Sequence, residues 1–584
     1  MSRSALAFLL VATAGTALAG SYSGPARPQS VYISWAAHDE LSDNVKLDEG
    51  LADRELAALA RLKGDGAQFD YFLLDMGWFD RDGGLRTFRK DRWPEGPGRF
   101  FAACAAQGLK PGLWLSTNVC GWSDEPFLHP RPEWSGSMGG YKDLAMSFTR
   151  GGFLDYQIAT MQRWYDQGVR LFKFDFANFE AASPGELARL GKVEVARRNS
   201  EAWRHALEKF RQRNPDVVLM AYNGYGGQTG DTYPTFTKSI NLAWLDAFDS
   251  LYCGDPKPSD VPCASFWRSL DVYSDAMVLQ YAANGVPLPR VDSSGFMIGN
   301  TGTIYRRGTA EWKGTLVLSA ARGGRVNTYY GDLALLDDKS GKWFGKVQRL
   351  YFPFQARAAV STFGGYPGAG VPYGFLGRGT GGAVATVVNP GMGFADVSLP
   401  LGGDLPLRVL YSDEPGARLS GGTLRLAPGQ LAVVGQGAYA DRSWDLGAGD
   451  ASGVPASCVP LPLAGLETCP GTVSATVIAP EGGVLRIVCT QARPDGRPLR
   501  LSGGAPPSGT SLGKLMVLTA EQDGRQLAMT RPYDRQVWSG MSWALGEVAP
   551  KDLVPGRPVR ITYAVTGKDS ASADIGLSAF GVHY

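Results

Sequence analysis

A lysine and an aspartate two residues apart, Lys173 and Asp175, stand within the apolar run of residues 169–178. In an extended segment, residues i and i+2 point to the same face of a sheet, so the ammonium and the carboxylate are expected side by side. A carboxylate held beside a cation stays ionised at neutral pH, which suits a nucleophile better than an acid. The alternative for this pair alone is a buried structural ion pair.

Glycoside hydrolysis is the chemistry that uses two carboxylates and neither a metal ion nor a cofactor. Asp175 supplies one carboxylate, and the sequence spacing leaves the second open among six residues, which are Asp246, Asp249, Asp255, Asp271, Asp275 and Asp292. Further polar candidates are Asp75 and Asn223, whose side chains suit sugar hydroxyls. Trp78 and Trp114 offer aromatic faces for a sugar ring, with a place in the hydrophobic core as their alternative.

Eight segments of strand character alternate with helical segments and would position these residues. The expected strands cover residues 30–35, 71–79, 111–118, 169–178, 217–223, 240–248, 296–300 and 325–330. The expected helices cover residues 52–62, 100–108, 154–168, 186–214, 266–283 and 312–321. This alternation predicts a (β/α)8 TIM barrel with its chemistry at the C-terminal strand ends. A doubly wound sheet would need a Gly-rich phosphate turn after the first strand, which the sequence lacks.

Beyond residue 361 the helical periodicity stops, and short alternating runs separated by Gly and Pro predict antiparallel β-sandwiches. We therefore expect an α/β plus all-β chain. Its barrel covers residues 20–355, a first β-sandwich 356–445, a Gly/Pro/Cys-rich linker 446–470, and a second β-sandwich 471–584. The second sandwich is either a structural brace or a carbohydrate-binding module, and its sequence leaves both open.

The first residues predict export. A basic start, a short apolar run and an Ala-x-Ala motif ending at Ala19 are typical of a signal peptide over residues 1–19, which implies a secreted or periplasmic protein. The formal net charge is only +2, so nothing suggests nucleic acid or an anionic membrane as a partner. No stretch is apolar for long enough to span a bilayer.

Seven cysteines are compatible with disulfides in an oxidising compartment. Two pairs bracket Pro-rich loops and are the favoured bonds, Cys253 with Cys263 and Cys458 with Cys469. Four histidines in 584 residues give a metal-centred mechanism little support, so we expect neither a metal nor a cofactor.

The motifs, in their order along the chain, resemble those of the α-galactosidase (melibiase) clan of glycoside hydrolases, families 27 and 36. Leu-Leu-Asp-Met-Gly-Trp-Phe at 73–79 resembles the Asp-Asp-Gly-Trp strand of the clan, with Met76 in place of the second Asp. Gly-Leu-Trp at 112–114 and Lys-Phe-Asp at 173–175 are similar to two further motifs of the clan. Phe-Trp-Arg-Ser-Leu-Asp at 266–271 resembles the acid/base segment and is one residue shorter.

The resemblance implies a role for each matched residue. Asp175 would be the nucleophile and Asp271 the acid/base, with Asp275 as the fallback if the shorter spacing misaligns the segment. Sugar contacts are implied for Asp75, Lys173 and Arg268. Asn223 stands at the position with which the clan reads the C2 substituent of the sugar, which leaves the identity of the sugar open.

Together the residues and the resemblance predict an exported retaining glycoside hydrolase that cleaves terminal α-galactosyl or closely related residues by double displacement. Its substrate would be an oligosaccharide, a polysaccharide or a glycoconjugate. The alternative is a non-catalytic carbohydrate-binding protein on a degenerate glycosidase barrel, which Met76 favours. The sequence leaves the oligomeric state open.

Overall fold

The computed structural model describes eleven segments of the chain, which are residues 24–38, 45–122, 125–139, 144–226, 240–293, 296–301, 307–449, 454–501, 512–531, 541–567 and 570–584. The signal peptide predicted at residues 1–19 lies outside the described residues.

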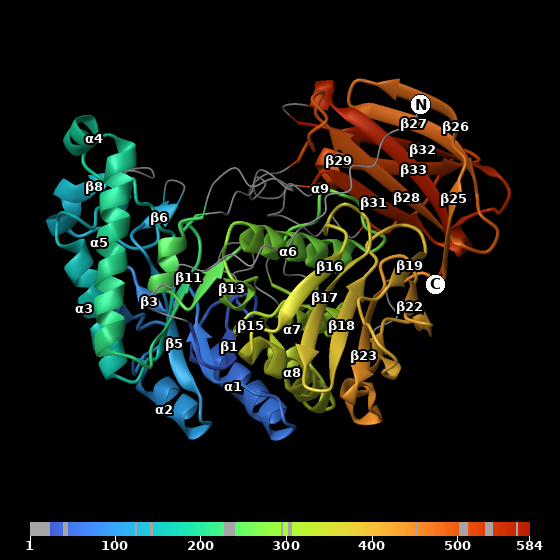
Figure 1. Ribbon diagram of the computed structural model, residues 1–584. Coiled ribbons are helices and arrows are strands. Elements are labelled where there is room, and N and C mark those ends of the chain that lie inside the picture. Colours follow the sequence, from blue (N-terminus) through green and yellow to red (C-terminus); the bar gives the residue numbers. More distant parts are fainter. Residues whose placement is uncertain are drawn as a thin grey trace.

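A parallel sheet forms the first part of the molecule (Figure 1). Its strands are β1 (Gln29–Ile33), β2 (Tyr71–Leu74), β5 (Lys110–Ser116), β10 (Leu171–Asp175), β11 (Val218–Ala221), β12 (Ser250–Tyr252), β13 (Val291–Asp292), β14 (Phe296–Ile298) and β15 (Val326–Gly331). Strand β13 pairs with β12 and β14 pairs with β15, all in parallel, so the two short strands share one position. The sheet therefore closes into the predicted barrel of eight strand positions.

Helices cover the outside of the sheet (Figure 1). They are α1 (Glu49–Gly64), α2 (Gly98–Ala106), α3 (Phe153–Asp166), α4 (Pro184–Leu190), α5 (Lys192–Arg213), α6 (Phe266–Ala283), α7 (Trp312–Ala321) and α8 (Ser340–Ala356). The single helix expected over residues 186–214 divides at Gly191, whose φ of 76° lies in the left-handed region that glycine adopts readily. None of the helices within the described residues is long and apolar enough to cross a membrane.

The expected sixth strand at residues 240–248 is wrong. The segment forms a 3-10 helix, Leu242–Asp246, whose first turn is capped because the Asn241 side chain accepts a hydrogen bond from the backbone N–H of Ala243. Trp244 fills a buried site against Phe179 and Tyr225 instead of joining the sheet. The sixth barrel position goes to β12, three residues long, which the apolar pattern of the sequence did not single out.

Two β-sandwiches follow the barrel, as predicted, but the linker expected at residues 446–470 contains strands of both. The first packs β16 (Val360–Gly364), β17 (Tyr373–Gly379), β18 (Gly382–Val388), β23 (Leu431–Gly437), β20 (Leu407–Ser412) and β24 (Gly447–Ala448) against β19 (Ala395–Ser398), β22 (Thr423–Leu426) and β21 (Arg418–Ser420). The second sandwich also consists of two sheets. One sheet has the strand order β25 (Ser457–Leu461), β33 (Asp574–His583), β28 (Val484–Ala492) and β31 (Trp543–Val548). The other has the order β26 (Ala464–Cys469), β27 (Thr472–Ile478), β32 (Pro558–Val565), β29 (Met516–Gln522) and β30 (Arg525–Gln526).

The two favoured disulfides are wrong, because all seven cysteines are free thiols. Cys458 and Cys469 lie on strands β25 and β26, which belong to different sheets of the second sandwich. Cys253 and Cys263 are both buried, and burial raises the pKa of each thiol. The loop between these two is held instead by contacts with the second sandwich.

Helix α8 packs closely against the backbone just after the end of α1. A Cβ atom on Gly345 would lie 2.2 Å from the carbonyl oxygen of Gly66, so we expect Gly345→Ala to destabilise the fold by about 1 to 3 kcal/mol. The control is Gly185→Ala on α4, where nothing lies within 4 Å of the added Cβ and better helix propensity should be neutral or stabilising. Urea denaturation of both variants checks this, and equal midpoints would contradict it.

Candidate active site

An ion pair at the C-terminal end of the barrel joins two strand positions. Lys173 on β10 donates from Nζ to Oδ2 of Asp75, which directly follows β2, over 2.7 Å, and both side chains are buried. The ammonium also lies 4.2 Å from the ring centre of Tyr222 and 5.5 Å from that of Tyr330. A buried charge is tolerated when it is paired, and here the carboxylate and two aromatic faces compensate the lysine.

Asp175 ends β10 and is almost fully buried. Its Oδ1 accepts hydrogen bonds from the backbone N–H groups of Phe176 at 2.9 Å and Asn223 at 3.1 Å, and its Oδ2 accepts from the Trp114 indole at 3.3 Å. Burial raises the pKa of Asp175, while the charge of Lys173 lowers it. These donors hold the carboxylate in one orientation and favour its ionised form.

The backbone just after Asp175 is strained. Phe176 has a φ of 52°, in the left-handed region that bulky residues avoid. The Phe176 N–H donates to Oδ1 of Asp175 just before this bend. Strain of this kind is typical of positions where the backbone serves a function.

Three tyrosines and two further aspartates line the same end of the barrel. The Tyr222 hydroxyl donates to Oδ2 of Asp292 at 2.5 Å and lies 2.5 Å from the Tyr330 hydroxyl. The rings of Tyr222 and Tyr252 stack with centroids 4.2 Å apart, and the Tyr252 hydroxyl donates to Oδ1 of Asp255 at 2.6 Å. The chain of contacts thus links the ends of strands β11, β12, β13 and β15.

The pKa of Tyr330 also indicates that these strand ends lie close together. Burial raises the pKa of the Tyr330 hydroxyl, and the charges of Asp292, Asp75 and Asp255 raise it further. The charges of Asp75 after β2, of Asp255 after β12 and of Asp292 at the end of β13 therefore all act on one hydroxyl at the barrel mouth. Within the described residues, no group of three or more His, Cys, Asp or Glu side chains is arranged to hold a metal ion.

The two tryptophans do not offer a face to a sugar, because both are fully buried. Trp78 packs against Phe88 and Trp164 and donates its indole N–H to the Trp114 carbonyl at 2.9 Å. Trp114 instead contributes its indole N–H to Asp175. Asn223, which is partly exposed, contacts Asp175 through its backbone.

Arg268 and Asp271 lie in a buried cluster at the start of α6. Arg268 donates to Asp271 at 3.0 Å and to Asp413 of the first sandwich at 2.9 Å. Asp275 accepts from Arg322 at 2.6 Å. Among the described contacts of Asp271 and Asp275, all run within α6, to α7 and its flanking residues or to the first sandwich, and none reaches Asp175. The structure therefore gives both aspartates structural partners.

Sequence reasoning left Asp255 and Asp292 as open alternatives and missed the tyrosines Tyr222, Tyr252 and Tyr330. A signal was present, since each tyrosine stands at the end of a barrel strand or directly after it. Without the correct sixth strand, however, Tyr252 and Asp255 could not be placed at the mouth.

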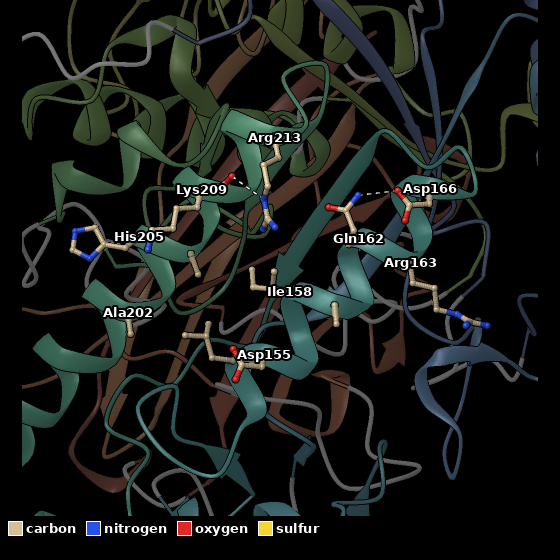
Figure 2. Close-up of a pocket in the computed structure, with 12 residues that line it drawn as sticks. Asp155, Ile158, Gln162, Arg163, Asp166, Ala202, His205, Lys209 and Arg213 are labelled. Carbon is tan, nitrogen blue, oxygen red and sulfur yellow. Dashed lines mark hydrogen bonds between the residues drawn. The ribbon is translucent and has the colours of Figure 1, made fainter.

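An open groove on the outer surface lies far from these strand ends. It runs between α3 and α5 and is lined by apolar side chains that include Leu154, Ile158 and Ala202 (Figure 2). Asp155, Asp166, His205 and Lys209 stand on its rims, and Gln162 donates to Asp166 at 2.8 Å. The groove belongs to the helical layer and contains none of the residues at the barrel mouth.

Solved α-galactosidases share this fold. The α-galactosidase from Lactobacillus brevis aligns with 70% of this chain and 55% of its own, at 15% sequence identity and a TM-score of 0.50. The GH36 α-galactosidase AgaA from Geobacillus stearothermophilus aligns with 71% of this chain and 56% of its own, at 12% identity and a TM-score of 0.50. The chain thus spans about half the length of these enzymes. No family model and no curated protein matches the sequence.

The Lys173–Asp75 pair gives a stability prediction. Lys173→Met leaves the Asp75 carboxylate buried and unpaired, which should cost about 3 to 5 kcal/mol of unfolding free energy. Lys173→Met combined with Asp75→Asn removes both charges and should recover a large part of this loss. Denaturation of the two single variants and the double variant measures the coupling, and strictly additive changes would show that the two side chains do not interact.

Proposed function

We propose that this chain is a retaining glycoside hydrolase that acts on terminal α-galactosyl or closely related residues. The observation that carries the proposal is Asp175, a carboxylate at the end of a barrel strand that is oriented by three N–H donors and whose pKa the charge of Lys173 lowers against the effect of burial. Likeness of fold to α-galactosidases supports the same class. Other residues at the barrel mouth supply the acid/base and the contacts with the sugar hydroxyls.

Asp175 acts as the nucleophile. Its carboxylate attacks the anomeric carbon, the bond from that carbon to the leaving oxygen breaks, and a glycosyl ester forms on the enzyme. The Trp114, Phe176 and Asn223 N–H groups fix the attacking oxygens before the substrate arrives, so little reorganisation is needed in the transition state.

Asp255 acts as the acid/base in place of Asp271. It follows β12, two strand positions from β10, and about 9 to 10 Å separates strands that are two apart. A retaining pair needs carboxyl groups about 5 to 5.5 Å apart, a gap that side chains reaching toward the barrel axis can close. Asp255 is partly exposed, so it can give a proton to the leaving oxygen and later take one from water.

The remaining polar groups suit the hydroxyls of a sugar ring. Lys173 and Asp75 supply a donor and an acceptor, and Asp292 adds a second carboxylate. Met76 replaces an acidic residue of the clan motif, so one hydroxyl contact must come from elsewhere. The substrate is an oligosaccharide, polysaccharide or glycoconjugate, and the predicted signal peptide supports a secreted or periplasmic enzyme.

Hydrolysis of p-nitrophenyl α-galactoside, α-N-acetylgalactosaminide, β-L-arabinopyranoside and α-glucoside tests the proposal. We expect one of them to be cleaved and Asp175→Asn to lose turnover while its far-UV circular dichroism stays unchanged. Near-normal activity of Asp175→Asn would overturn the nucleophile assignment. Binding of glycans by the wild type without turnover would favour the non-catalytic alternative.

Asp255→Ala separates the two acid/base candidates. For a substrate with a poor leaving group, loss of the acid should cost about 100-fold or more in kcat/KM. With an activated leaving group, for which hydrolysis of the glycosyl-enzyme limits turnover, added azide should restore turnover and give a glycosyl azide of retained configuration, since azide replaces the water that needs a base. Asp271→Asn is the control, because its partners are Arg268 and Thr315, and a full loss of activity in a folded Asp271→Asn would reverse the assignment.

Trp114→Phe should change the pH dependence of the reaction. Burial raises the pKa of Asp175 and the Trp114 N–H opposes this, so removing the N–H raises the pKa further. Because the ionised carboxylate is the nucleophile, the acid limb of kcat/KM moves to higher pH. A pH profile of kcat/KM measures this, and a shift to lower pH would contradict it.

A further inference from the structure

The loop between β12 and α6, residues 253–265, is bound by the second sandwich. Both carboxylate oxygens of Asp260 accept from Arg500, at 2.9 Å from Nε and 2.5 Å from Nη2. The Trp543 indole donates to the Ser259 carbonyl at 2.6 Å, and the Ser542 hydroxyl lies 3.1 Å from Oδ1 of Asp260. The side chains of Asp260 and Arg500 are largely buried, so the bidentate pair is little screened by solvent.

The same sandwich also covers the start of α6, which follows the loop. Phe266, the first residue of α6, is buried in the core of the second sandwich and contacts Trp543 at 6.2 Å between ring centroids. In Figure 1, α6 lies against the second sandwich, drawn in orange and red. The loop is thus held at Ser259 and Asp260 and again at its junction with the helix.

The segment that connects this clamp to Asp255 is stiff. Its sequence is Asp-Pro-Lys-Pro-Ser-Asp over residues 255–260. Pro256 and Pro258 fix their own φ angles, and each restricts the residue before it to extended conformations. The two prolines therefore limit how far Asp255 can move relative to Asp260, while Tyr252 holds Asp255 from the side of the barrel.

The charges of the clamp and of Asp255 act on one tyrosine of α6. Burial raises the pKa of the Tyr273 hydroxyl, the Arg500 guanidinium lowers it, and Asp260 and Asp255 raise it. Tyr273 is buried on α6, so charges from both ends of the segment influence the same hydroxyl.

We propose that the second sandwich positions the acid/base loop of the barrel, with Arg500 and Trp543 as its positioning residues. This inference rests on the function proposed above. The sandwich contributes to catalysis by setting the distance of Asp255 from the leaving oxygen, beyond any contribution to stability. Removing the clamp should impair proton donation and leave the attack by Asp175 intact.

The test compares leaving groups in the full-length chain. In Arg500→Met combined with Asp260→Asn, both charges disappear and no unpaired ion stays buried. We expect kcat/KM for a poor leaving group, such as phenol, to fall about tenfold more than kcat/KM for an activated one, such as dinitrophenol, since only the poor one needs the acid. A uniform loss across leaving groups, or no loss, would overturn the inference.

A matched control lies in the same sandwich. Arg486 pairs with Glu547 at 2.8 Å and is buried, and its described hydrogen bonds go to Glu547 and Tyr584 and not to the loop. Arg486→Met combined with Glu547→Gln should change stability without changing the ratio of the two leaving groups. If it changes that ratio as strongly as the clamp variant does, general destabilisation of the sandwich explains both and the inference fails.

A milder variant keeps the inference testable if the double variant does not fold. Trp543→Phe removes only the N–H that binds the Ser259 carbonyl, and it should change the leaving-group ratio in the same direction. Failure of the proposed function is distinguishable, because Asp175→Asn and Asp255→Ala would then behave like the wild type. If those two variants lose activity and the clamp variants keep the wild-type ratio, only the positioning role is refuted.

Discussion

The pairing of buried charge at the barrel mouth is the constraint on which the arrangement of the site depends. An unpaired ammonium inside a barrel costs several kcal/mol, so Lys173 needs Asp75 and the two tyrosine faces near it. This requirement fixes β2 relative to β10 across β5. Asp175 lies two residues further along β10, so the same strand sets the position of its backbone. Local N–H donors then orient its carboxylate.

A second set of charges organises the contact between the barrel and the sandwiches. Arg268 at the start of α6 binds Asp271 of its own helix and Asp413 of the first sandwich, while Asp260 just before the helix binds Arg500 of the second. Burial raises the pKa of Asp413 to about 6, and the Arg268 charge opposes this. The start of α6 is therefore a junction where all three parts of the chain meet around paired ions.

This junction gives Asp271 a place in the fold that differs from the one its motif suggested. Trp-Arg-x-x-Asp is a strong local pattern, and on a helix it brings the arginine and the aspartate within one turn of each other. In this chain Arg268 donates hydrogen bonds both to Asp271 and to Asp413 of the first sandwich. The loop before the helix carries another carboxylate, Asp255, which accepts a hydrogen bond from Tyr252 at the end of β12.

The sequence by itself determined the barrel and the two sandwiches after it, because periodicity is a local property. It expected Lys173 beside Asp175, whereas in the structure the lysine pairs with Asp75 from another strand position. It placed the sixth strand wrongly, since residues 240–248 alternate like a strand and the true strand, β12, is only three residues long. The tertiary structure alone decided which aspartates meet, which tryptophans are core, and that the cysteines stay free. These outcomes depend on which side chains become buried together, and segments far apart in sequence decide that.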